Sequence, residues 1–225
     1  MAGETAIEHS ARKDEHLRIN LEEDVQFKCV KTGFDAYRFV HCALPELDAS
    51  AIDTSVHIFG KRLSMPLIIS PMTGGTASAA RINRHLALAA QALHVGLSIG
   101  SQRPAIESPE VAATYRVRDE APDVLLFANL GAVQLNYGFG VAECQKAVDM
   151  IEADVLTLHL NPLQEALQPG GNTNFSGLLR KIEMVCRSLS VPVVVKEVGC
   201  GISEETTRLL VSAGVAGLDI AGAGG

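Results

Sequence analysis

The sequence has no tryptophan, and aromatic residues make up only 4% of its 225 residues. It has no uninterrupted apolar stretch of 18 residues, so it offers no candidate for a membrane-spanning helix. Its first residues, MAGETAIEHSARKDEH, lack the apolar run of a secretory signal. These absences predict a cytoplasmic protein with no membrane partner.

Positive charge and paired cysteines are also scarce. The 19 basic residues are outnumbered by 26 acidic ones, which gives a net charge of −7 and argues against general nucleic-acid binding. The cysteine count is odd and no CxxC motif occurs, so a disulfide framework is not expected. Free thiols in a reducing compartment are predicted at Cys29, Cys42, Cys144, Cys186 and Cys200.

What the chain does contain is a repeating pattern of short apolar runs, each followed by a polar or glycine-rich turn and a helical pattern. Near-continuous apolar runs of this length are typical of strands buried on both faces of a parallel sheet. The predicted strands are Leu67–Ser70, Val95–Ile99, Val124–Asn129, Val155–Leu160, Val193–Glu197 and Gly217–Ala221.

Helix signals fall between these runs. Residues Ala77–Leu93 have apolar positions at helical spacing. Ser108 before Pro109 predicts a helix start with a serine N-cap, and Ser203 predicts another. Gly214 is expected to end the last helix in a left-handed conformation.

Two architectures fit six βα repeats, an open doubly wound sheet and a (β/α)₈ TIM barrel. No GxGxxG motif follows the first strand, which disfavours the dinucleotide-binding version of the open sheet. We therefore expect an α/β barrel that is incomplete in this chain. Residues 66–225 would supply its first six strands, and residues 1–65 would form an N-terminal extension packed on the barrel.

Polar and glycine-rich chemistry recurs at the carboxyl end of each predicted strand, which is where such barrels place their active sites. The segments are Pro71-Met72-Thr73-Gly74-Gly75, Gly100-Ser101-Gln102-Arg103, Asn129-Leu130-Gly131, His159 to Glu165, and Lys196-Glu197. The first could let a flat ring approach the backbone, although a glycine pair is also an ordinary turn. Arg103 suits a phosphate or carboxylate, or else covers a helix end.

The segment His159 to Glu165 carries the densest cluster. On an extended strand His159 and Asn161 would share a face, and Pro162 would break the strand so that Gln164 and Glu165 lie on the following loop. A single carboxylate, Glu165, is too little for a Ca²⁺ cage but enough for Mg²⁺, which also takes phosphate oxygens and waters.

Two basic features complete the candidates. Lys196 ends a buried strand, where it could be a Schiff-base nucleophile, a phosphate contact, a cation beside an anionic cofactor, or a side chain that only reaches solvent. Arg12 and Lys13 could close over a phosphate or simply belong to a solvated helix face.

Taken together, these motifs resemble those of the type 2, FMN-dependent isopentenyl-diphosphate isomerases, in the order in which that family has them. The resemblance implies an isomerase that interconverts isopentenyl and dimethylallyl diphosphate in isoprenoid biosynthesis, with FMN kept reduced by NADPH and with Mg²⁺. It also implies a homo-oligomer, a tetramer or octamer.

The resemblance implies the following roles, each for a residue that matches a family motif. Gln164 relays a proton near the alkene, and Glu165 binds Mg²⁺. The flavin is expected to contact Pro71, Met72, Thr73, Ser101, Asn129 and Lys196. The substrate is expected to contact Arg12, Lys13, Ser101, Arg103, His159, Asn161 and Gln164.

Two competing interpretations remain at this stage. One is another FMN-dependent barrel oxidoreductase, of the α-hydroxy-acid oxidase type, and the other is an inactive truncated barrel. Yellow colour in the purified protein would favour the flavin interpretations.

Overall fold

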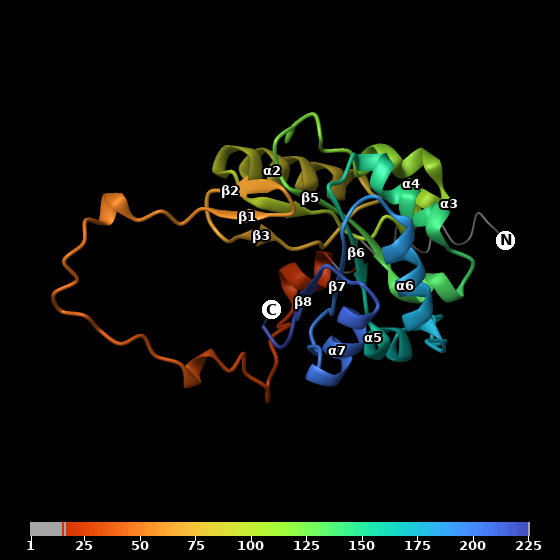
Figure 1. The fold of residues 1–225 in the computed structure, drawn as a ribbon. Helices are drawn as coiled ribbons and strands as arrows, with labels where there is room; N and C mark the ends of the chain where they lie inside the picture. The colour runs from red at the N-terminus through yellow and green to blue at the C-terminus, as the bar shows by residue number, and fades with distance from the viewer. Residues whose placement is uncertain (1–14, 16, 225) are drawn as a thin grey trace.

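A computed structural model describes residue 15 and residues 17–224, and its main feature is a six-stranded parallel sheet (Figure 1). The strands pair in sequence order, each with the next, which is the arrangement of consecutive barrel strands. This confirms the α/β barrel-type fold and all six predicted strands. The strands are β3 (Ile68–Ile69), β4 (Gly96–Ser98), β5 (Leu126–Gly131), β6 (Val155–His159), β7 (Val193–Lys196) and β8 (Gly217–Asp219).

Helices follow the strands and cover the outer face of the sheet (Figure 1). The α-helices are α2 (Ala77–Leu93), α3 (Arg103–Glu107), α4 (Val141–Ile151), α5 (Pro162–Leu167), α6 (Leu178–Ser188) and α7 (Glu204–Ser212). The 3₁₀ helices are η1 (Phe34–Ala36), η2 (Ala49–Ala51), η3 (Pro109–Thr114) and η4 (Ala132–Asn136). Among the residues that the structure describes, no helix combines the length and apolar character needed to cross a bilayer.

The helix-boundary predictions are mostly confirmed. The bounds of α2 are those expected, and the Ser203 side chain accepts a hydrogen bond from the Thr206 amide at the start of α7. Gly214 has φ +88°, the left-handed conformation predicted for it. The prediction at Ser108 was wrong in detail, because a 3₁₀ helix follows it and its side chain makes no capping bond.

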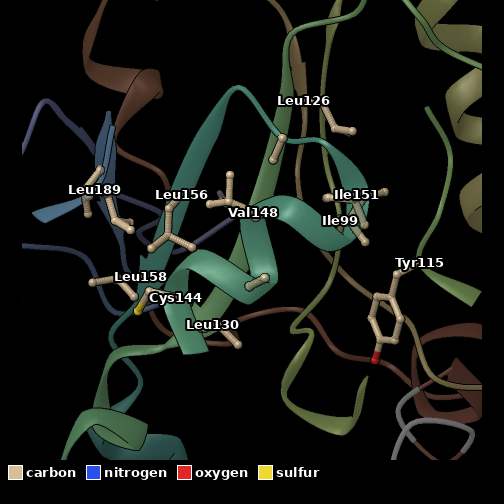
Figure 2. Close-up of a cluster of buried hydrophobic side chains, with 14 of the residues drawn as sticks. Ile99, Tyr115, Leu126, Leu130, Cys144, Val148, Ile151, Leu156, Leu158 and Leu189 are labelled. Atoms are coloured by element: carbon tan, nitrogen blue, oxygen red, sulfur yellow. The ribbon is translucent and has the colours of Figure 1, made fainter. Parts of the chain in front are cut away.

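The hydrophobic core lies between the sheet and the helices. Side chains alternate along each strand, so Leu126 and Leu130 of β5 and Leu156 and Leu158 of β6 face α4 (Figure 2). Cys144 of α4 is fully buried among them, and this burial raises the pKa of its thiol to about 12. All five cysteines are free, as predicted.

A β-hairpin covers part of the inner face of the sheet at the amino ends of the strands. It consists of β1 (Val56–Ile58) and β2 (Lys61–Leu63), and Leu63 packs with Phe127 and Val194 from inside the sheet. The hairpin turn has positive φ at Phe59 (+46°) and Gly60 (+79°), the conformation of the tight turns that suit strand twist. The Phe59 ring meets the Phe127 ring edge-on, with centroids 6.4 Å apart.

The segment before the hairpin is extended and exposed. Residues 24–53 contain no buried side chain, and they arch from the side of β8 to the side of β3 (Figure 1). The start of this segment and the loops after β7 and β8 together line a cavity of about 720 Å³. Arg12 and Lys13 lie outside the described residues.

Candidate active site

A cavity of about 140 Å³ opens at the carboxyl ends of the central strands. Its lining residues come from the ends of five strands, β3 to β7, or from the segments just after them, and from α5, and most of them are sequence-predicted site residues. They are Pro71, Met72, Gly100, Ser101, Asn129, His159, Gln164, Lys196 and Val198. Strand ends far apart in the sequence thus bring one set of polar groups together, as expected of a barrel.

A larger cavity of about 480 Å³ lies beneath it, inside the curve of the sheet. The two cavities share Pro71 and Lys196 in their linings. The inner cavity has an apolar floor that includes Phe59 and Phe127, and its polar residues include Ser98 and Asp219. Lys196 therefore lies at the boundary between the site and the barrel interior.

Asn129 and His159 form a hydrogen-bonded pair across neighbouring strands. The distance from His159 Nδ1 to Asn129 Oδ1 is 3.0 Å. The pairing register places His159 opposite Gly131, where a Cβ would lie 3.1 Å from His159 Nε2. The absence of a side chain at Gly131 thus lets the imidazole lie against β5.

Gln102 supports this pair from the core and was not among the predicted site residues. Its side chain is fully buried. Gln102 Oε1 accepts a hydrogen bond from the backbone N–H of Asn129 at 3.0 Å, and Gln102 Nε2 donates to the backbone carbonyl of Ala147 at 2.8 Å. It therefore ties β5 to α4 and fixes Asn129 from behind. The sequence alone does not show whether the side chain of Gln102, next to Ser101, points into the site or into the core.

Asn161, Gln164 and Glu165 lie together, but not as expected. Gln164 and Glu165 are on the short helix α5 rather than on a loop, because Pro162 occupies the first turn, where its missing N–H costs nothing. Asn161 precedes this helix, beyond the end of β6, so the shared strand face with His159 was also wrong.

Hydrogen bonds link this cluster. Asn161 Nδ2 donates to Gln164 Oε1 at 3.1 Å and to Glu165 Oε1 at 3.0 Å, while Glu165 Oε2 accepts from the Asn172 amide. Asn161 and Glu165 are buried, and Asn161 Oδ1 has no hydrogen-bond partner among the described residues. The cluster therefore presents a carboxylate and a spare amide oxygen, both of which are oxygen ligands that Mg²⁺ accepts. No group of three or more His, Cys, Asp or Glu side chains suited to a metal occurs in the described part of the chain.

Gly100 lets the segment after β4 lie directly against the backbone of Thr73 in the segment after β3. A Cβ on Gly100 would lie 2.5 Å from the Thr73 carbonyl oxygen, so only glycine permits this contact between the two segments. The Thr73 hydroxyl is buried without a partner in the described structure. Tyr115, whose pKa is raised by burial, donates its hydroxyl to the Ser101 carbonyl at 3.0 Å and holds this segment from below.

Arg103 does not line the small cavity. It lies at the start of α3, where its Nε donates to Glu107 Oε1 at 2.8 Å one turn along the helix. The pair is partly buried, with 23% of the Arg103 side chain exposed. To reach a phosphate in the site, this guanidinium would have to exchange or share that carboxylate.

Lys196 is held by two oxygen atoms. Its Nζ donates to the Glu197 carbonyl at 2.7 Å and lies 3.3 Å from Asp219 Oδ2 on β8. The Glu197 carboxylate points elsewhere and accepts backbone N–H groups from Val198, Gly199, Cys200 and Gly201. Neither Asp219 nor the role of Glu197 was predicted, because partners supplied by a neighbouring strand have no local motif.

Comparison with known proteins matches residues 10–127 to the family of FMN-dependent dehydrogenases. The chain belongs to this family. Curated relatives of this chain include an isopentenyl-diphosphate delta-isomerase from Synechocystis sp., 56% identical over 95% of this chain and 61% of that protein. Proteins with the same name from Nostoc sp. and Stutzerimonas stutzeri are 54% and 53% identical, each over 96% of this chain. These similarities confirm the resemblance drawn from the motifs.

The chain spans about 61% of the length of the first two of these relatives. Among solved structures it is similar to a mandelate oxidase variant, with a TM-score of 0.51 and 19% identity over 76% of this chain and 51% of that one. At this identity the likeness supports the fold alone, and it agrees with six strands of a flavoenzyme-type barrel.

Proposed function

We propose that this chain carries the greater part of the site of an isopentenyl-diphosphate isomerase, which moves a carbon–carbon double bond within a diphosphate ester using reduced FMN and Mg²⁺, with NADPH as reductant. The observation that carries the proposal is the single cavity in which Met72, Ser101, Asn129, His159 and Gln164 meet. The 53–56% identity to proteins of that name supports it.

The residues near the cavity fit a flavin. The unpartnered, buried hydroxyl of Thr73 is a hydrogen-bonding group awaiting a ligand, and the contact at Gly100 leaves backbone free of side chains beside Ser101. We assign FMN to Pro71, Met72, Thr73, Ser101, Asn129 and Lys196. When bound, reduced FMN would supply an electron-rich ring that stabilises cationic character at the substrate carbon.

The diphosphate and Mg²⁺ are assigned to residues at and beyond the carboxyl ends of β4 and β6, and to Arg12 and Lys13. His159, Ser101 and Arg103 would hold phosphate oxygens, and Arg12 and Lys13 would add positive charge. Asn161 would join them by exchanging one of its two donated bonds, to Gln164 or Glu165, for a bond to a phosphate oxygen. Glu165 would bind Mg²⁺ through one oxygen, while its bonds to Asn161 and Asn172 fix the carboxylate. Mg²⁺ would complete its coordination with water and phosphate oxygens.

Gln164 is assigned to the proton transfer. Its amide has no useful pKa, so it would orient a proton donor or a water rather than act as an acid itself. Gln164 Oε1 already accepts from Asn161, which leaves its amide N–H groups available to a group in the cavity. The neighbouring side chains would exclude water and hold the alkene in place.

The test is reconstitution. The protein would be mixed with FMN, and yellow colour that stays with the protein on gel filtration would show binding. With Mg²⁺, NADPH and isopentenyl diphosphate under anaerobic conditions, NMR would then follow the appearance of dimethylallyl diphosphate. A protein that binds FMN but does not bind isopentenyl diphosphate in the presence of Mg²⁺ would refute the isomerase assignment. The same gel filtration would test the proposed homo-oligomer, a tetramer or octamer.

A further inference from the structure

Lys196 is an ammonium group placed where few charges are tolerated. The residue is only 8% exposed, on a strand buried between its neighbours. Moving an ammonium out of water costs several kcal/mol unless an anion and hydrogen-bond acceptors compensate for the lost hydration. The groups that surround Lys196 therefore decide where its charge is held.

The described groups that face Lys196 come from both neighbouring strands and from its own. On β6 its register partner is His159, on β8 its register partner is Asp219, and its own strand continues into Glu197. The Glu197 carboxylate is already engaged by four backbone N–H groups and offers Lys196 only its carbonyl oxygen. Asp219 is thus the carboxylate that pairs with the ammonium, at 3.3 Å.

Asp219 is itself held in place. Its Oδ1 accepts from the Ala221 amide at 3.2 Å, and its carbonyl accepts from the Glu197 amide at 3.1 Å. One carboxylate oxygen is therefore fixed to the backbone of its own turn while the other faces Lys196. The side chain is 43% exposed, so the pair joins a buried cation to an anion at the edge of the inner cavity.

We propose that Asp219 is a positioning residue that fixes the Lys196 ammonium at the carboxyl end of β7, at the boundary between the small cavity and the inner cavity. Lys196 lines both cavities, and rotation of its side chain would move the charge from one to the other. The Glu197 carbonyl sets the direction of one N–H, and Asp219 sets a second. The inference rests on the proposed function only in its last step, the contact between Lys196 and flavin.

The first test needs no cofactor. Cyanate is small enough to reach a buried amine, and mass spectrometry measures carbamylation of Lys196 as a rate. Asp219→Asn removes the ion pair with little change in shape, and we expect the Lys196 rate to rise about fivefold or more. Asp219→Glu, which restores a carboxylate, should return the rate toward that of the parent protein. Glu183→Gln is the matched control, since it removes an equal charge from an exposed pair with Arg187 on α6 and should leave the rate unchanged.

The second test reads the position of the charge at the flavin. In protein loaded with FMN, Asp219→Asn should shift the visible absorption and circular-dichroism bands of the bound flavin, and Asp219→Glu should restore them. An unchanged carbamylation rate would overturn the pairing, and a changed rate with unchanged flavin bands would overturn the positioning role. If the parent protein binds no FMN, the proposed function fails, while the carbamylation series still decides whether Asp219 holds Lys196.

Discussion

The two ends of the parallel sheet differ in how completely their polar groups are hydrogen-bonded. At the amino end, Arg118 donates to several backbone carbonyls and pairs with Asp154 at 3.0 Å, and Asp154 also accepts from the Leu126 amide at 2.9 Å. The carbonyls belong to Ala121, Pro122, Val124 and Glu152. At this end one side chain satisfies several carbonyls that precede two strands.

The carboxyl end leaves hydrogen-bonding capacity unused. Of three buried side-chain atoms without a partner in the described structure, Thr73 Oγ1 and Asn161 Oδ1 lie at this end, and Ser98 Oγ faces the cavity just below it. Such groups are costly in a folded protein unless a ligand or an ordered water satisfies them. The difference indicates that the amino end is built for stability and the carboxyl end for binding, and substitutions at the two ends should separate these properties.

The largest expected effect is at Gln164. Gln164→Leu should lower kcat by about 10²–10⁴-fold, because a positioned proton transfer contributes this much, while KM and FMN affinity hardly move. Gln145→Leu, the same change on α4, should leave kcat unaltered. If Gln164 only stabilises the start of α5, the variant would instead keep its turnover and lose about 1–2 kcal/mol of stability in thermal unfolding.

The corresponding change at the amino end should act on stability alone. Arg118→Met leaves the four carbonyls without their side-chain donor and leaves Asp154 only the Leu126 amide and Lys61, which should cost about 3 kcal/mol in urea denaturation. FMN binding by the folded fraction should match that of the parent protein. Arg187→Met, on an exposed ion pair, should cost less than about 0.5 kcal/mol. If the Arg118 variant lost flavin affinity at a low temperature where it is folded, the amino end would affect binding as well as stability, contrary to this prediction.

Glu165 should show both kinds of effect. Glu165→Gln should raise the Mg²⁺ concentration needed for half-maximal turnover by about tenfold, which corresponds to roughly 1.4 kcal/mol. Because the carboxylate also accepts from Asn172, stability should fall by about 1 kcal/mol as well. Glu143→Gln removes a similar carboxylate bond to the Gly140 amide away from the site and should show the stability loss without any change in Mg²⁺ dependence. Equal Mg²⁺ dependence in all three proteins would mean that Glu165 is not the ligand.

The smallest expected effect is on FMN affinity alone, at Thr73. Thr73→Val replaces an unpartnered hydroxyl with a methyl group of similar shape, so stability without FMN should be unchanged or slightly higher. FMN should bind about fivefold more weakly in a fluorescence titration. Thr114→Val is the contrast, because that hydroxyl accepts from Gly75 and donates to Val111 and should cost about 1 kcal/mol. If the Thr73 variant were destabilised but bound FMN with normal affinity, the hydroxyl would stabilise the fold rather than bind the flavin.

The strands and the general place of the site could be predicted because they depend on local patterns. Apolar runs such as Val193–Lys196 and the cap at Ser203 are readable from neighbouring residues alone. The β1–β2 hairpin was missed because Phe59, not the usual Asn or Asp, takes the left-handed turn position, and its reason for being there is a contact with Phe127.

The difference between local patterns and contacts made only in the folded chain also explains the errors within the site. The pairing of Arg103 with Glu107, the inward direction of Gln102 and the partnership of Lys196 with Asp219 all depend on which way a side chain turns once the chain is folded. A motif identifies residues that can do chemistry. It does not identify the neighbours that hold them.

The strand order also bears on how the protein is made. Each strand pairs with the one just before it, as with Ile68 and Gly96 or Phe127 and Val155, so a new strand leaving the ribosome finds its partner already synthesised. The β1–β2 hairpin also pairs consecutively, but its packing depends on later residues. Leu63 packs against Phe127, Val155 and Val194, which are translated much later. The first strands to be synthesised are thus among the last to reach their final contacts, and until then the nascent chain carries their apolar side chains unprotected.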